Sequence, residues 1–295
     1  MLKKTSGGSY DPSEEYVYFL ATGPGRHGEA QNKLGHDVVQ TYPYVLIAVN
    51  ELESAKSFDK VEELLDQGRK VLVDSGVFNL AMGHARTHGM TMDAALSLPP
   101  DEVDGFEELL EKYYKVAERY KDRMWGMIEV DQGGGAVKPH TRARIERESG
   151  IVPIPVWHPL LDGIDYYHGL VAEYDRICVG NLVKANPSLR VRMLSAVSEL
   201  SKQNPNIWHH LLGVTPSELT FALPVKGSSD SSTWLQGSRW PQAWGSKSMG
   251  KKIGGFGPDF SYTGDLFYRS DAIAFNEAAA EMEHVRDLQG KVQAW

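Results

Sequence analysis

The chain has very little cysteine, with Cys178 alone among 295 residues. A single cysteine excludes an intramolecular disulfide framework and any zinc site built from several cysteines. The sequence also lacks an apolar run near the ~18 residues of a membrane span, and its first residues contain no apolar signal core. We therefore expect a cytoplasmic protein (in the host cytoplasm if a phage encodes it) with no membrane partner, no cofactor and no structural zinc.

Positive charge is the scarcer sign, with 31 Lys and Arg against 39 Asp and Glu and a net charge of −8. This balance argues mildly against a polyanionic partner, although a local basic patch can coexist with an acidic whole. A hydrophobic content of 41% is typical of a globular protein. The length suits one barrel domain of ~250 residues with additions.

Strand-like and helix-like patterns alternate about eight times along the chain. Most of the strand candidates are continuous apolar runs, which is typical of parallel strands buried on both faces. They are Tyr16–Ala21, Tyr44–Val49, Lys70–Asp74, Met124–Asp131, Val152–Trp157, Arg176–Val183, Trp208–Val214 and Ser228–Trp234. The alternation predicts an α/β fold, a (β/α)8 TIM barrel. A doubly wound open sheet is the alternative, but no G-x-G-x-x-G follows the first strand.

The predicted barrel is a single domain within residues 1–295, with additions to the repeat. The barrel covers about 16–235, and a C-terminal extension with a closing helix covers about 236–295. Loop insertions at 22–42 and 80–104 follow the first and third strands. Both insertions lie on βα connections, the side of a barrel where active sites are found.

Polar side chains fall at or just beyond the ends of six predicted strands. They are Asp74, Asp131, His158, Asn181, Thr215 and Asp230. Any one aspartate at a strand end can be explained as a helix cap or an Asx-turn. Several around one barrel mouth instead indicate a site. Two carboxylates from separate strands suit a reaction that needs a nucleophile and a proton carrier.

Short motifs around these residues resemble those of the tRNA-guanine transglycosylases and their relatives, the 7-deazaguanine DNA transglycosylases of phages and bacteria. Asp74-Ser75-Gly76 followed by Phe78 resembles the family's Asp-Ser-Gly-Gly-Phe/Tyr motif. The other matching segments, in order, are Val130-Asp131-Gln132, Val179-Gly180-Asn181-Leu182 and Leu212–Leu219. Asp230 then falls where the family keeps its nucleophile. The resemblance covers roughly residues 16–240.

Three departures favour a DNA-acting member over a tRNA-acting one. The chain has no counterpart of the Cys-x-Cys-x-x-Cys zinc cluster of the tRNA enzymes, and Val77 replaces the second glycine of the first motif. The sequence around the nucleophile also differs, because Asp230 is followed by Ser231-Ser232-Thr233-Trp234.

The resemblance implies roles for the residues at the mouth. Asp230 would attack C1′ of the nucleotide, and Asp74 would protonate the departing guanine and deprotonate the incoming base. The base, a free 7-deazaguanine such as preQ0, would contact the remaining set: Ser75, Gly76, Phe78, Asp131, Trp157, His158, Gly180 and Asn181. The partner is DNA, with tRNA less expected, and a homodimer or an accessory protein is possible.

Cations near the C-terminus are candidates for phosphate contacts. They are Lys226, Arg239, Lys247, Lys251 and Lys252. A plain solvated pair is the alternative for Lys251-Lys252, and His209-His210 is expected to pack rather than bind metal. Three other functions stay open: a tRNA-guanine transglycosylase, a glycosidic-bond hydrolase, and a non-catalytic nucleic-acid-binding subunit.

Overall fold

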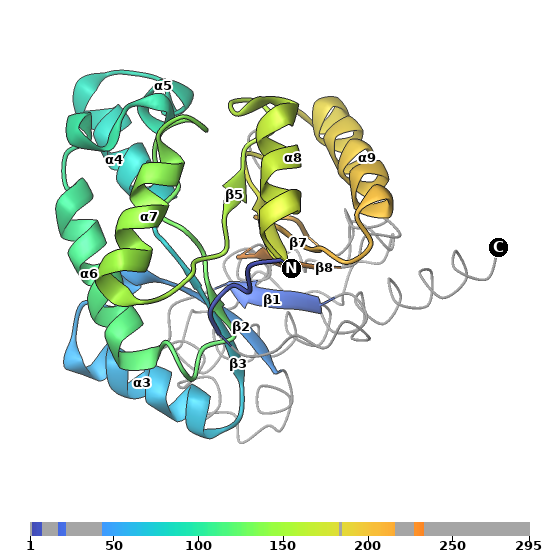
Figure 1. The fold of residues 1–295 in the computed structure, drawn as a ribbon. Helices are drawn as coiled ribbons and strands as arrows, with labels where there is room; N and C mark the ends of the chain where they lie inside the picture. The colour runs from blue at the N-terminus through green and yellow to red at the C-terminus, as the bar shows by residue number, and fades with distance from the viewer. Residues whose placement is uncertain (1, 8–16, 22–42, 183–184, 216–226, 233–295) are drawn as a thin grey trace, which may run out of the picture.

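The computed structural model describes residues 2–7, 17–21, 43–182, 185–215 and 227–232 (Figure 1). Eight parallel strands within this part form one sheet in the order β4-β3-β2-β1-β8-β7-β6-β5. Their bounds are β1 Val17–Ala21, β2 Tyr44–Ala48, β3 Lys70–Asp74, β4 Gly126–Met127, β5 Val156–Trp157, β6 Arg176–Val179, β7 Trp208–Leu211 and β8 Gly227–Ser231. Each overlaps a strand predicted from the sequence.

A backbone bridge between the segments that contain β4 and β5 joins the two ends of the sheet. Ile128 pairs with Ile154 in parallel. The Glu129 amide donates to the Ile154 carbonyl at 3.0 Å, and the Ile154 amide donates to the Met127 carbonyl at 2.8 Å. The fold is therefore the predicted α/β, TIM-barrel-like cylinder.

Helices lie between the strands and cover the outside of the sheet (Figure 1). They are α3 Ala55–Asp66, α4 Val77–His88, α5 Met92–Ser97, α6 Phe106–Tyr120, α7 Lys138–Ser149, α8 Gly163–Glu173 and α9 Pro187–Gln203, with short 3-10 turns η1 Val49–Glu51 and η2 Pro100–Glu102. In α6 the buried residues include Phe106, Leu109, Leu110 and Tyr113, which recur at the three- and four-residue spacing of an amphipathic helix. None of the described helices is long and apolar enough to cross a membrane.

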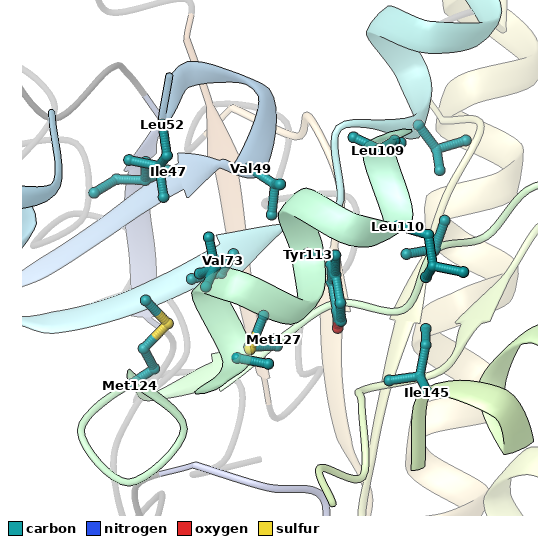
Figure 2. Close-up of a cluster of buried hydrophobic side chains, with 14 of the residues drawn as sticks. Ile47, Val49, Leu52, Val73, Leu109, Leu110, Tyr113, Met124, Met127 and Ile145 are labelled. Carbon is teal, nitrogen blue, oxygen red and sulfur yellow. The ribbon is translucent and has the colours of Figure 1, made fainter. Parts of the chain in front are cut away.

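Alternate strand residues supply two different cores. Val71 and Val73 face the helices, and Figure 2 shows Val73 with Ile47, Met127 and residues of α6 in this outer layer. Leu72, between the two valines, instead joins a cluster with Phe19, Trp125 and Trp208 inside the barrel. Because side chains alternate along a strand, the position two after each interior residue also faces inward.

The predicted insertion after the third strand contains α4, α5 and η2, and the barrel helix α6 follows it. Gln132, buried just beyond β4, fixes the insertion to the barrel. Its Nε2 atom donates to the carbonyls of Ala95 and Leu98, both at 2.8 Å. The residues after β4 are thus attached to the inserted helices. The other predicted insertion, 22–42, and the C-terminal extension lie outside the described residues.

Charged side chains replace part of the backbone ladder between β4 and β5. The Val156 amide donates to Glu129 Oε1 at 2.5 Å, and Lys138 Nζ donates to the Val156 carbonyl at 2.8 Å. Each charge has a buried counter-ion, because Arg142 Nε lies 2.7 Å from Glu129 Oε2 and Lys138 Nζ lies 2.5 Å from Asp162 Oδ2. Such pairing is what allows charges to remain in an interior.

Candidate active site at the C-terminal mouth of the barrel

Strand alternation places the predicted site residues on the inner face of the barrel. Asp74 follows interior Leu72 by two positions, and Asp230 follows interior Ser228 in the same way. The same spacing beyond Val156, Cys178 and Trp208 turns three further residues inward: His158, Gly180 and His210. These positions all lie at strand C-termini, so they surround one mouth.

Asp74 is a carboxyl group that can be protonated at neutral pH. Burial, together with the charges of Asp131 and Asp230, raises the pKa of Asp74 to about 7. The Gly76 amide donates to Asp74 Oδ2 at 3.2 Å and opposes this rise. A group with a pKa near 7 can donate and accept a proton in one catalytic cycle.

Asp131 behaves in the opposite way because it has a basic partner. His158 Nε2 lies 2.9 Å from Asp131 Oδ2, and the Ser75 hydroxyl donates to Oδ1 at 3.4 Å. Burial alone would raise the pKa of Asp131, but the hydrogen bond and charge of His158 and the charge of Lys138 hold it below the usual value. Asp131 is therefore an ionised acceptor beside a protonatable Asp74.

Asp230 is held through one of its two oxygens. The Gly213 amide donates to Oδ1 at 3.0 Å, and His210 Nε2 lies 3.3 Å from the same atom. Both contacts that the described residues make to this carboxylate are on Oδ1. This arrangement orients the carboxylate through Oδ1.

A buried chain of hydrogen bonds links Trp208, Ser228 and His210. Trp208 Nε1, which can only donate, lies 2.9 Å from Ser228 Oγ. Ser228 Oγ also lies 2.7 Å from His210 Nδ1, and the other ring nitrogen, Nε2, faces Asp230. Sequence reasoning missed this role for His210, and the alternation of β7 was the signal that could have found it.

His209 fits the structural role expected for it. Its ring is buried, Nε2 lies 3.1 Å from the Tyr167 hydroxyl and Nδ1 lies 3.1 Å from the Ile207 carbonyl. Burial lowers the pKa of His209 to about 4. The adjacent histidines thus face opposite sides of β7, and His210 alone of the two faces the mouth.

Backbone geometry explains the glycine and asparagine positions of the two motifs that were expected to bind the base. Gly76 has φ of +82° and caps α4, and a β-carbon there would lie 2.7 Å from Asn50 Oδ1. Asn181 also has a positive φ, of 60°. Both segments therefore turn sharply at the mouth, and the turn at Gly76 brings its amide next to Asp74. Asn50, in η1 directly after β2, is a further neighbour of the mouth that the sequence did not suggest.

The two aromatic residues expected at the base site lie in different places. Phe78 is in the first turn of α4 and is 49% exposed, next to the Asp74 loop. The Trp157 side chain instead faces the helices, where its ring packs against Tyr167 and Nε1 donates to the Gly163 carbonyl at 2.9 Å. The structure thus does not bring Trp157 to the mouth, because strand alternation places its neighbour His158 there. The predicted cations Lys226, Arg239, Lys247, Lys251 and Lys252 lie outside the described residues.

Comparison with known proteins adds little to this description. No protein family profile and no curated protein matches the chain. The chain is similar to a solved cube-shaped, highly porous protein cage designed by fusing symmetric oligomeric domains, with 10% identity, a TM-score of 0.43 and coverage of 95% of this chain and 78% of that one. It is also similar to a 4-hydroxy-2-oxoglutarate aldolase/2-deydro-3-deoxyphosphogluconate aldolase from TTHB1, with 13% identity, a TM-score of 0.39 and coverage of 92% and 100%. Similarities at this level say nothing about the reaction, so the function has to be argued from the side chains at the mouth.

Proposed function

We propose that the protein is a transglycosylase that replaces guanine in DNA with a 7-deazaguanine base. The observation that carries this proposal is the different state of the carboxylates around one mouth. Asp74 has a pKa of about 7, Asp131 is ionised beside His158, and Asp230 is oriented through Oδ1. Base exchange needs these three functions: a proton carrier, a base-binding acceptor and a nucleophile.

The first half of the reaction breaks the bond to guanine. Asp230 Oδ2 forms a bond to C1′ while the C1′–N9 bond breaks, and protonated Asp74 gives its proton to the departing base. The sugar is then held as an ester of Asp230, as in retaining glycosidases. Asp74 is left ionised, ready for the incoming base.

The second half reverses these steps with a different base. Asp74 removes the N9 proton of the 7-deazaguanine, whose N9 attacks C1′ and displaces the Asp230 carboxylate. Both protons pass through Asp74, and no oxidant or cofactor is needed. A raised pKa suits this double use better than that of an ordinary aspartate.

Asp131 provides the recognition in this scheme. Guanine and 7-deazaguanines share a donor edge, N1–H and the exocyclic amine, which matches a carboxylate acceptor. Because His158 and Ser75 already contact Asp131, its position is fixed before the base arrives. The target nucleotide has to be flipped out of the duplex to reach this pocket, at a cost of a few kcal/mol.

The direct test is incubation of the protein with duplex DNA and isotope-labelled 7-cyano-7-deazaguanine, followed by nucleoside mass spectrometry. We expect labelled deazaguanosine in the DNA and an equal amount of free guanine. Guanine release without incorporation would instead identify a hydrolase. Incorporation only into tRNA, tested in parallel, would refute the DNA substrate. DNA binding without either product would indicate a non-catalytic subunit.

A further inference from the structure

Two histidines of α4 and the aspartate before α6 form a compact cluster among the inserted helices. His88 Nε2 lies 2.7 Å from Asp104 Oδ2, and His84 Nδ1 lies 3.3 Å from the same oxygen. One donor atom from each of the three residues lies within 4.8 Å of the others. We propose that His84, His88 and Asp104 bind a divalent transition-metal ion, with Zn²⁺ as the reference ion.

Sequence spacing accounts for this arrangement. Residues four apart on a helix lie on one face, so His84 and His88 project together, and their ring centroids are 4.2 Å apart. Two imidazoles and a carboxylate are ligands that zinc accepts, with water in the fourth position. The cluster has no cysteine, so the single Cys178 does not exclude it, and the proposal replaces the expectation from the sequence that the protein has no structural zinc.

Two of the three separations between ligand atoms can be compared with those of a tetrahedral site. Ligand atoms bound at about 2.0–2.2 Å around such an ion lie about 3.3 Å from one another. The separation of 3.3 Å between His84 and Asp104 already fits. The contact of 2.7 Å between His88 and Asp104 has to widen, and these side chains are 43% and 70% exposed and have room to move.

A metal ion would have to compete with hydrogen bonds already present in the cluster. The Asp104 amide donates to His84 Nδ1 at 3.3 Å, so an ion that binds this nitrogen would replace that backbone hydrogen bond. The competing arrangement without metal is the contact of 2.7 Å between His88 and Asp104, which zinc would have to replace.

A bound ion would connect α4 to the start of α6. Figure 1 shows α4 and α5 at the upper left of the molecule, above the label of α6. Since α4 begins at Val77, directly after the Asp74-Ser75-Gly76 loop, the ion would restrain the helix that this loop leads into. The proposal does not depend on the transglycosylase reaction, because the cluster does not include the carboxylates of the mouth.

The test is calorimetric titration of chelator-treated protein with Zn²⁺, with circular dichroism as a check of folding. The wild type should bind one ion per chain at a saturable site and gain thermal stability. Both H88A and D104N change exposed side chains, and each should weaken binding by more than about 10-fold. The matched control H140A, which removes an exposed histidine of α7, should bind as the wild type does.

Cobalt supplies a second readout that does not depend on stability. Co²⁺ in the wild-type site should give the visible absorption of a tetrahedral ion, and this absorption should be lost in H88A and D104N but kept in H140A. Absence of stoichiometric binding by the wild type would overturn the proposal. Wild-type affinity in both H88A and D104N would also overturn it.

Discussion

The ring of His158 occupies the space beside Gly180 that a β-carbon would need. An added β-carbon at Gly180 would lie 2.5 Å from His158 Cδ2 and 2.7 Å from Nε2. The same Nε2 atom lies 2.9 Å from Asp131. A glycine directly after β6 thus leaves the space in which a histidine after β5 contacts an aspartate after β4.

We expect Gly180→Ala to displace His158 and release Asp131 from its partner. Overpacking of this kind typically costs about 1–3 kcal/mol. Affinity for free 7-cyano-7-deazaguanine, measured by calorimetry, should fall. The matched control is Gly169→Ala on α8, where an added β-carbon meets no atom within 4 Å, and where alanine should add up to about 1 kcal/mol of stability. Wild-type base affinity in Gly180→Ala would contradict the positioning role.

Asp230→Asn and Asp230→Ala should abolish base exchange and leave the fold intact. The amide of asparagine can no longer form the ester with C1′, and losses of about 10⁴-fold or more are typical when a covalent nucleophile is removed. Wild-type protein should give a denaturation-resistant adduct with DNA that both variants lack. Near-normal turnover by Asp230→Asn would refute the assignment.

Asp74 should make stability fall as pH rises toward 8. Its pKa is about 7 in the folded protein, above the ordinary value of 3.8, so its contribution is complete below about pH 4 and is lost as pH rises through 7. At 1.36 kcal/mol per pKa unit, the change in the free energy of unfolding is at most about 4 kcal/mol. It is smaller than this limit because the Asp74 side chain keeps some contact with water.

Denaturant unfolding at pH 5 and pH 8 measures this effect. The decline between the two pH values should be smaller in Asp74→Asn than in the wild type. Guanine release in a single turnover should also decline above pH 7, because protonated Asp74 is the acid. An identical pH dependence of stability in variant and wild type would show that Asp74 titrates normally.

The buried pair of Lys138 and Asp162 should matter far more than any surface pair. Both side chains are fully shielded from solvent, so Lys138→Met leaves a buried carboxylate without its counter-ion and should cost about 3–5 kcal/mol in chemical denaturation. The control Lys202→Met breaks an exposed pair with Glu199 on α9 and should cost at most about 1 kcal/mol. Equal losses in the two variants would contradict this account.

Neutralising the four cations Arg239, Lys247, Lys251 and Lys252 should weaken DNA binding and flatten its salt dependence. Each lost duplex phosphate contact should reduce the slope of log affinity against log salt by roughly 0.9. Affinity for the free base should not change, because its predicted contacts are at the mouth. An unchanged salt slope would move the search for the DNA-binding surface to residues 22–42 and 80–104.

Long apolar runs made the barrel predictable. Lys70–Asp74 was predicted with the bounds that the structure has, because a β-branched run ends there at an aspartate. The segments Met124–Asp131 and Val152–Trp157 contain strands of two residues each. Buried side chains replace part of the backbone pairing between these two strands, and no local sequence pattern encodes such tertiary contacts.

The ends of the predicted strands indicate which residues lie near the mouth. They do not fix which side chains point into it, and the prediction is less accurate there. Asp74, Asp131, His158 and Asp230 lie at the mouth as expected. Trp157 precedes His158, and His210 follows His209, and in each pair the two side chains point to opposite faces of the sheet. An error of one residue in the predicted alternation therefore exchanges the two faces. The His84–His88 spacing was visible in the sequence, but Asp104 joins the histidines only through the packing of α4 against α6.

Charged side chains make part of the contact between β4 and β5, and this joint of the cylinder differs in that respect from the other strand pairs. There the amide of Val156 is bound by a carboxylate, and its carbonyl by an ammonium group, where other strand pairs use backbone. Asp131 and His158 lie just past this joint on its two sides. A base that binds between them would therefore hold β4 and β5 together where the pairing of the strands is least regular. This stabilisation should slow amide hydrogen exchange at Ile154 and Val156 when the free base is added, even though no reaction takes place.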